Sequence, residues 1–181
     1  MLVRKRRQSA LGFTLLETMV ATAILAFGVL GLAAMLANGL AYMHSSQDDF
    51  IAHQKAEEAV EGIFAARDTA QVTWADIQNV QGGVGVFLPG PQPLLAPGPN
   101  GVVGTAQDQA NNPDCIILPG ADGIMGTADD VRVPLSNFQR TITITNVAGN
   151  PNLRTIQVVI TYNTGQLQRT YQLTTYISAF S

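Results

Sequence analysis

The stretch that decides the fold reads Gly12-Phe13-Thr14-Leu15-Leu16-Glu17, and a long apolar run follows it. Four basic residues precede it at positions 4 to 7, and Glu17 is the only charged residue from Phe13 to Met43. An apolar run of about 18 residues or more can span a bilayer, and basic residues on one flank keep that flank in the cytoplasm. The sequence therefore predicts a cytoplasmic basic leader, a membrane helix over 13–43, and a remainder delivered across the membrane.

Two features of this run are unusual for a plain membrane anchor. Glu17 places a carboxylate in the apolar segment, which costs roughly 2.5 kcal/mol or more unless the group has a partner. The run from Phe13 to Met43 is about 46 Å long as a helix, whereas the hydrocarbon core of a bilayer is about 30 Å thick. The excess apolar surface must therefore pack against the chain's own domain or against other chains.

The motif resembles the processing site of type IV prepilins and of the related pseudopilins of type II secretion. The resemblance implies that a prepilin peptidase cuts between Gly12 and Phe13 and that Phe13 is then methylated on its new amino terminus. It also implies that Glu17 is the buried glutamate of the family, which neutralises the terminal amine of a neighbouring subunit. Each group would then offset the desolvation cost of the other.

A plain signal-anchor and a cleaved secretory signal peptide are the alternatives for this segment. Such a signal has an apolar core of 7–15 residues and a small-x-small cleavage site. Ala37-Asn38-Gly39 has that form, but the apolar run is about twice the length of such a core, which favours the prepilin interpretation. Cleavage after Gly12 would remove four of the 10 basic residues and leave all 13 acidic ones. An acidic mature chain argues against nucleic-acid binding.

The rest of the chain, 44–181, has the length of one extracytoplasmic domain. The helix is expected to continue to about Arg67, because apolar residues recur there at spacings of three and four. This predicted stripe consists of Ala52, Ala56, Ala59, Val60, Ile63 and Phe64. Trp74 is expected in the small core.

Cys115 is the only cysteine, so no intramolecular disulfide can form. It is expected to be a buried small hydrophobe, and pairing between chains is the alternative. Many pilins close a late loop with a disulfide, and this chain departs from that pattern.

Glycine and proline clusters predict a loop region over 82–137, with short strands around 85–88 and 115–118. Alternation of apolar and polar residues then predicts three strands over 138–147, 153–162 and 167–178, the last two joined by a tight turn at Asn163-Thr164-Gly165-Gln166. One apolar face suits an antiparallel sheet lying on the helix. The expected fold is therefore α+β and, by the resemblance, type IV pilin-like. The tail 173–178 also resembles the last strand of PilV-type minor pilins.

Candidate metal and catalytic groups are few. Asp122, Asp129 and Asp130, with Thr127, could supply oxygens to calcium, but the spacing is not that of an EF-hand and a plain turned loop is the preferred interpretation, so no cofactor is expected. His44 and His53 are nine positions apart, which does not suit metal ligands on one helix face. The acidic groups 48–49 and 57–61 are typical of a solvated helix face. No catalytic constellation is recognisable, and a structural subunit is expected rather than an enzyme.

The resemblance implies a minor pilin that waits in the bacterial inner membrane with its N-terminus in the cytoplasm and then enters a type IV pilus. Its expected partners are the prepilin peptidase, other pilin subunits, the inner-membrane assembly platform and membrane lipid. A minor pseudopilin of a type II secretion system is the first alternative. A membrane-anchored binding or sensory protein, which would keep residues 1–12, is an alternative of another class.

Overall fold

The computed structural model describes residues 12–165 and 167–180; the expected leader therefore lies outside the described residues except for Gly12. Two compact units meet between His44 and Ser45, and each is described by itself. One helix is assigned through both, α1 (Leu15–Asp68). Its ends lie close to the predicted ones, at about Phe13 and Arg67.

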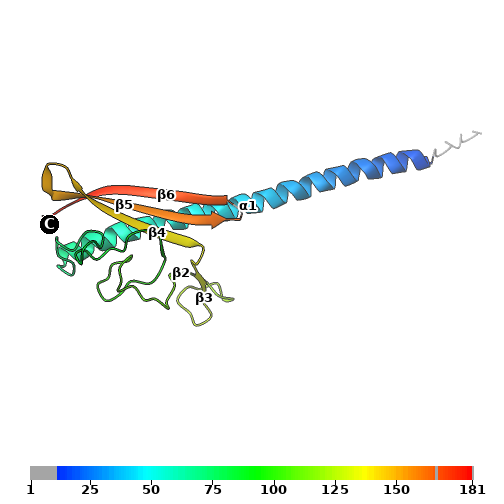
Figure 1. Ribbon diagram of the computed structural model, residues 1–181. Coiled ribbons are helices and arrows are strands. Elements are labelled where there is room, and N and C mark those ends of the chain that lie inside the picture. The colour runs from blue at the N-terminus through cyan, green and yellow to red at the C-terminus, as the bar shows by residue number, and fades with distance from the viewer. Residues whose placement is uncertain (1–11, 166, 181) are drawn as a thin grey trace, which may run out of the picture. The chain divides into compact units, whose positions relative to one another are not determined.

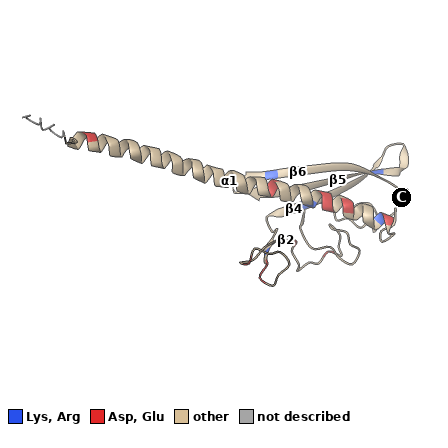
Figure 2. Cartoon of the chain, turned by 180° about the vertical axis from the view of Figure 1, so that it is seen from behind, with Lys and Arg blue, Asp and Glu red and all other residues tan. Residues whose placement is uncertain are grey.

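In the first unit, every described residue is exposed. The large apolar side chains from Phe13 to Met43 are between 51% and 81% exposed. Figure 2 shows this part of the helix nearly free of charged side chains. The segment is long and apolar enough to cross a membrane, as the sequence predicts.

The second unit contains a four-stranded antiparallel sheet in the order β1-β4-β5-β6 (Figure 1). Its strands are β1 (Gln92–Pro93), β4 (Phe138–Val147), β5 (Asn150–Thr164) and β6 (Leu167–Ser178). The predicted meander is confirmed, and the left-handed φ of 62° at Gly165 serves its last turn. A separate antiparallel ribbon pairs β2 (Cys115–Leu118) with β3 (Val131–Pro134). The arrangement is the expected α+β one.

Three short strands differ from the prediction. β1 and β3 were not predicted, because strands of two and four residues leave too little alternation to recognise. The strand expected at 85–88 is wrong. The glycines at 82, 83 and 85 have φ of 61°, 85° and 86°, so this segment folds into turns. Phe87 makes only isolated bridges, to Asn79 and Thr105.

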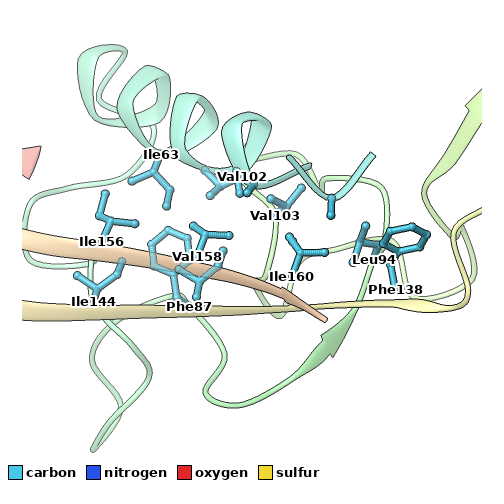
Figure 3. Close-up of a cluster of buried hydrophobic side chains, with 14 of the residues drawn as sticks. Ile63, Phe87, Leu94, Val102, Val103, Phe138, Ile144, Ile156, Val158 and Ile160 are labelled. Atoms are coloured by element: carbon cyan, nitrogen blue, oxygen red, sulfur yellow. The ribbon is translucent and has the colours of Figure 1, made fainter. Parts of the chain in front are cut away.

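The core of the second unit lies between α1 and one face of the sheet (Figure 3). The predicted helix stripe is confirmed: its alanines are completely buried, and their small size lets the sheet approach the helix. Ile156, Val158 and Ile160 of β5 are completely buried on the facing side. Loop side chains, including Phe87, fill the remaining space. Trp74 is half-buried and packs against this core.

Polar side chains fix the loops in this domain without a disulfide. Asn79 bonds the backbone of β4 twice, donating to the Ile142 carbonyl at 2.7 Å and accepting from the Ile144 N–H at 2.8 Å. Arg154 of β5 donates to the carbonyls of Trp74 and Ile77. These bonds attach the segment between α1 and the loop region to the sheet.

Candidate functional site

The helix begins at a cap formed by the motif itself. Thr14 precedes the first helical residue, and its Oγ1 accepts a hydrogen bond from the Glu17 N–H at 3.2 Å. The Thr14 carbonyl accepts the next bond, from the Thr18 N–H at 3.2 Å. Threonine followed three residues later by glutamate is the capping-box pattern, and this spacing is the signal that the sequence analysis missed. The motif therefore fixes where α1 starts, as well as marking the predicted processing site.

The bond between Gly12 and Phe13 lies just outside that cap. Both residues are exposed and non-helical, and Phe13 is 81% exposed. Among the described residues, no atom beyond its chain neighbours lies within 4 Å of the position that a Gly12 side chain would occupy. The scissile peptide of the predicted cleavage is thus exposed and outside regular secondary structure, a form in which a peptidase can bind it.

Glu17 occupies the first turn of α1. There the partial positive charge of the helix N-terminus stabilises a carboxylate. Among the described residues, no hydrogen bond or ion pair of the Glu17 carboxylate occurs within this single chain. The acid is therefore oriented by its own helix end and left available for a group from outside the chain.

The threonine hydroxyl groups of the apolar half bond within the helix, unlike this acid. Thr18 Oγ1 donates to the Leu15 carbonyl at 2.8 Å, and Thr22 Oγ1 donates to the carbonyls of Thr18 and Met19 at 2.9 Å. Such bonds are what a polar group in hydrocarbon requires. Asn38 lies about 37 Å along the helix from Phe13, farther than the roughly 30 Å thickness of a bilayer core. Within one bilayer thickness of Phe13, Glu17 is the side chain that still needs a partner.

Comparison with known protein families bears directly on this segment. The prokaryotic N-terminal methylation motif matches residues 7–33. The chain carries a prepilin-type N-terminus. The match includes Gly12, Phe13 and Glu17, and it indicates prepilin-peptidase processing, anchoring in the inner membrane before assembly, and a structural rather than enzymatic role. Neither the curated proteins nor the solved structures gave a match to this chain.

The aspartates of the loop 119–130 bond to that loop itself. Asp122 Oδ1 accepts from the Ile124 N–H at 2.9 Å, and Asp130 Oδ2 accepts from the Gly126 N–H at 2.7 Å. A hydrogen bond from Thr127 at 2.6 Å is the main reason that the pKa of Asp129 lies below its ordinary value. These bonds suit the preferred interpretation of a turned loop. In the part of the chain that the structure describes, no cluster of three or more His, Cys, Asp or Glu is arranged to hold a metal ion. Calcium binding is not otherwise tested and remains the alternative to the plain turned loop.

The acidic pair Asp48-Asp49 is not the solvated face that the sequence suggested. Asp48 accepts from Thr164 Oγ1 at 3.0 Å, and Asp49 accepts from Tyr162 and from Arg169 Nη1, the latter at 2.9 and 3.1 Å. Burial and the bond to Asp49 raise the pKa of Tyr162 to about 12. A hollow of about 510 Å³ lies here, and its charged groups are paired with each other. The pair fixes the β5–β6 hairpin to α1, a role invisible to sequence patterns because the partners are more than 110 residues away.

The remaining glutamate and histidine positions that the sequence analysis singled out on α1 are exposed, as the sequence predicts. Glu57, Glu58 and Glu61 are exposed, as a solvated helix face requires. His44 and His53 are also exposed, as expected; His53 lies 3.3 Å from the Glu57 carboxylate.

The expectation of a buried Cys115 is wrong. This residue is half-buried on β2, which pairs with β3 in a ribbon separate from the four-stranded sheet. The thiol lines a hollow of about 310 Å³ together with Arg132 of the facing strand. Cysteine composition alone could not have shown this, since exposure here depends on where the ribbon packs.

Proposed function

We propose that the chain is a minor subunit of a type IV pilus, cut between Gly12 and Phe13 and then incorporated into the filament or used to prime it. The observation that carries this proposal is Glu17, held in the first turn of an exposed apolar helix with no partner within the described chain. The methylation motif over residues 7–33 supports the processing step.

Before assembly, lipid covers the apolar half of α1. The helix is longer than the hydrocarbon core, so its last turns project toward the side where the domain folds. Cleavage removes the basic leader that holds the N-terminus in the cytoplasm and creates an amine at Phe13. This lowers the barrier to drawing the helix out of the membrane through the assembly platform.

In the filament, the apolar helices exchange lipid for one another. The new amine of Phe13 and the Glu17 carboxylate of a neighbouring subunit are then both desolvated, and their attraction offsets that cost when the two approach closely. Neither group alone is stable in such a setting. The pairing therefore selects processed subunits in the correct axial register.

The ranking of a minor pilin above a pseudopilin depends on the resemblance of 173–178 to PilV-type tails. These residues lie in β6, at the edge of the sheet, where a subunit-specific surface can be presented. A pseudopilin of a type II secretion system would share the processing and the fold, and the genes adjacent to this one would separate the two systems. A membrane-anchored binding protein would instead retain the leader and would not depend on Glu17.

Replacement of the acid tests the proposal. Glu17→Ala should insert into the membrane normally but lower incorporation into filaments by at least about tenfold, which corresponds to about 1.4 kcal/mol of lost pairing. Glu17→Gln, which keeps the shape and removes the charge, should fail equally, whereas Asn38→Ala is the matched control and should assemble. Immunoblots of membrane and sheared-filament fractions provide the measurement. Filaments that contain normal amounts of the Glu17→Ala chain would refute the proposal.

A further inference from the structure

The hairpin formed by β2, β3 and their connecting loop, 115–134, exposes an unusual amount of apolar surface. It contributes six of the twelve exposed large apolar side chains that the structure describes after Ser45. These six are Ile117, Leu118, Ile124, Met125, Val131 and Val133, with exposed fractions from 36% to 60%. Contiguous exposed apolar surface on a folded domain marks an interaction site more often than single scattered residues do.

The strand register collects part of this surface on one face. Ile116 pairs with Val133, and Leu118 pairs with Val131, so all four side chains point to the same side of the ribbon. Ile116 packs against the core, and the other three continue that apolar face outward. A two-stranded ribbon is at best marginally stable in water, so this face gains from a cover.

The loop at the end of the hairpin holds its apolar residues in a defined conformation. Ile124 and Met125 are 60% and 56% exposed. The Ile124 N–H is bonded to Asp122, and the Gly126 N–H, directly after Met125, is bonded to Asp130. A loop that is ordered before binding loses less conformational entropy when a partner arrives. The hairpin thus presents two apolar side chains on a preorganised tip.

Charge decides what kind of partner can cover this surface. After Gly12 the chain has six basic residues. Three of them, Lys55, Arg67 and Arg169, are in ion pairs, and Arg140 and Arg154 are buried. Among the described residues this leaves Arg132 as the one exposed basic side chain without an ion pair. Figure 2 shows acidic positions along α1, and three aspartates surround the hairpin tip. The hairpin itself carries three aspartates and only Arg132 as a basic residue, so a second copy of it would bring net negative charge against net negative charge.

We infer that the 115–134 hairpin docks on a subunit of different sequence, whose apolar patch is surrounded by lysine or arginine. The apolar side chains supply the contact, and the aspartates at the tip select a basic neighbour and reject a second copy of the same chain. This inference rests on the proposed function, because a filament subunit is where such a neighbour is met. It goes beyond that function by assigning the contact surface and the chemistry of the partner.

Site-specific photo-crosslinking in cells that assemble the filament tests this inference. A benzophenone side chain replaces Met125 in the full-length chain, and the matched control places it at Val84, which is 48% exposed in another loop. The expected result is one heteromeric adduct from position 125 that is absent from position 84. Mass spectrometry should identify the captured protein as one with its own N-terminal methylation motif and a basic exported domain. Ile124→Asp in the same chain should lower the adduct yield by about tenfold.

Three results would overturn the inference: an adduct with a second copy of this chain, an adduct with an acidic partner, or no difference between positions 125 and 84. The absence of any adduct from filaments that contain the chain would also overturn it. The mass of the N-terminus is read from the same samples. A chain that is processed at Phe13 but gives no adduct contradicts only the docking surface, whereas an unprocessed chain contradicts the proposed function.

Discussion

The two halves of α1 differ in the size and in the exposure of their apolar side chains. From Leu15 to Met43 the helix carries large apolar side chains, and they are exposed. In the second unit its buried positions are mainly alanines such as Ala52, Ala56 and Ala59, which are completely buried in the core formed with the sheet and the loops. The comparison teaches that one helix can serve two kinds of neighbour. The first half presents bulky surface to lipid or to other helices, and the second half accepts a sheet that the same chain provides.

Each of the two units also contains a charged side chain that has no hydrogen-bond or ion-pair partner among the described residues. Glu17 is exposed in the first half, and its carboxylate has no partner among the described residues. Arg140 of β4 is only 1% exposed, and none of its guanidinium nitrogens has a hydrogen-bond partner in the described structure. Burial lowers the pKa of Arg140, although the charges of Asp108, Glu58 and Asp114 oppose this. The first ion is available to another molecule, whereas the second is enclosed by its own domain.

The largest stability effect is expected from enlarging a buried alanine. Ala56→Leu inserts a side chain where the sheet lies against the helix, so we expect the free energy of unfolding to fall by about 1–3 kcal/mol or more. Ala33→Leu makes the same change in the exposed half, and the domain should unfold as in the unmodified chain. Thermal unfolding followed by circular dichroism in detergent measures both. Equal destabilisation by the two substitutions would show that the halves do not differ as described.

A smaller effect, of opposite sign, is expected from removing the buried charge. Arg140→Met keeps an aliphatic side chain and removes an unpaired guanidinium. Apolar replacement of even paired buried charges is often neutral or stabilising by about 1–4 kcal/mol. We expect the urea midpoint to rise or stay unchanged, with the same processing at Phe13. A fall in the midpoint equivalent to more than about 1 kcal/mol would show that the charge is compensated within the fold.

The features that the sequence predicts correctly are those that depend on interactions between residues close together in the chain. The helix and the three long strands are recognisable because their apolar residues repeat over many turns or pairs. The apolar stripe that includes Ala56 and Ile63, for example, is recognisable from its spacing, and it faces the sheet as predicted. Thr14 and Glu17 are only three residues apart, so the cap was predictable although it was missed.

The parts that escaped prediction depend on distant partners. The bonds of Asn79 to β4 and of Asp49 to Tyr162 and Arg169 join residues more than 60 positions apart, and no local pattern announces them. The strand expected at 85–88 is absent because Gly85 and the preceding Gly82 and Gly83 adopt left-handed conformations, although the apolar residues of the segment resemble a strand. Sequence patterns therefore locate the regular elements, and long-range polar contacts decide how the loops are held.

The smallest expected effect is a change in how the free energy of unfolding depends on pH above pH 10. Tyr162 has a pKa of about 12 in the folded domain, above its ordinary value of 10.0, because of burial and its contact with Asp49. The folded state therefore holds this proton more tightly, so the resulting stability is complete below pH 10 and is lost as the pH rises toward 12.

Tyr162→Phe should be slightly less stable at neutral pH, because Asp49 loses a donor, and should show a shallower loss of stability between pH 10 and 12. Tyr176→Phe, at an exposed position of β6, is the control and should follow the unmodified chain. Unfolding midpoints measured across this pH range make the comparison. Identical slopes for all three proteins would contradict the linkage of Tyr162 to folding.

The mass of the mature N-terminus tests most directly whether the first half of α1 is built for an amine–carboxylate pair between subunits. Intact-protein and peptide mass spectrometry of the chain from filaments should find that it begins at Phe13 and carries one methyl group on that amine. A chain that still begins at Met1, or that begins near Leu40 after signal-peptide cleavage, would contradict the account.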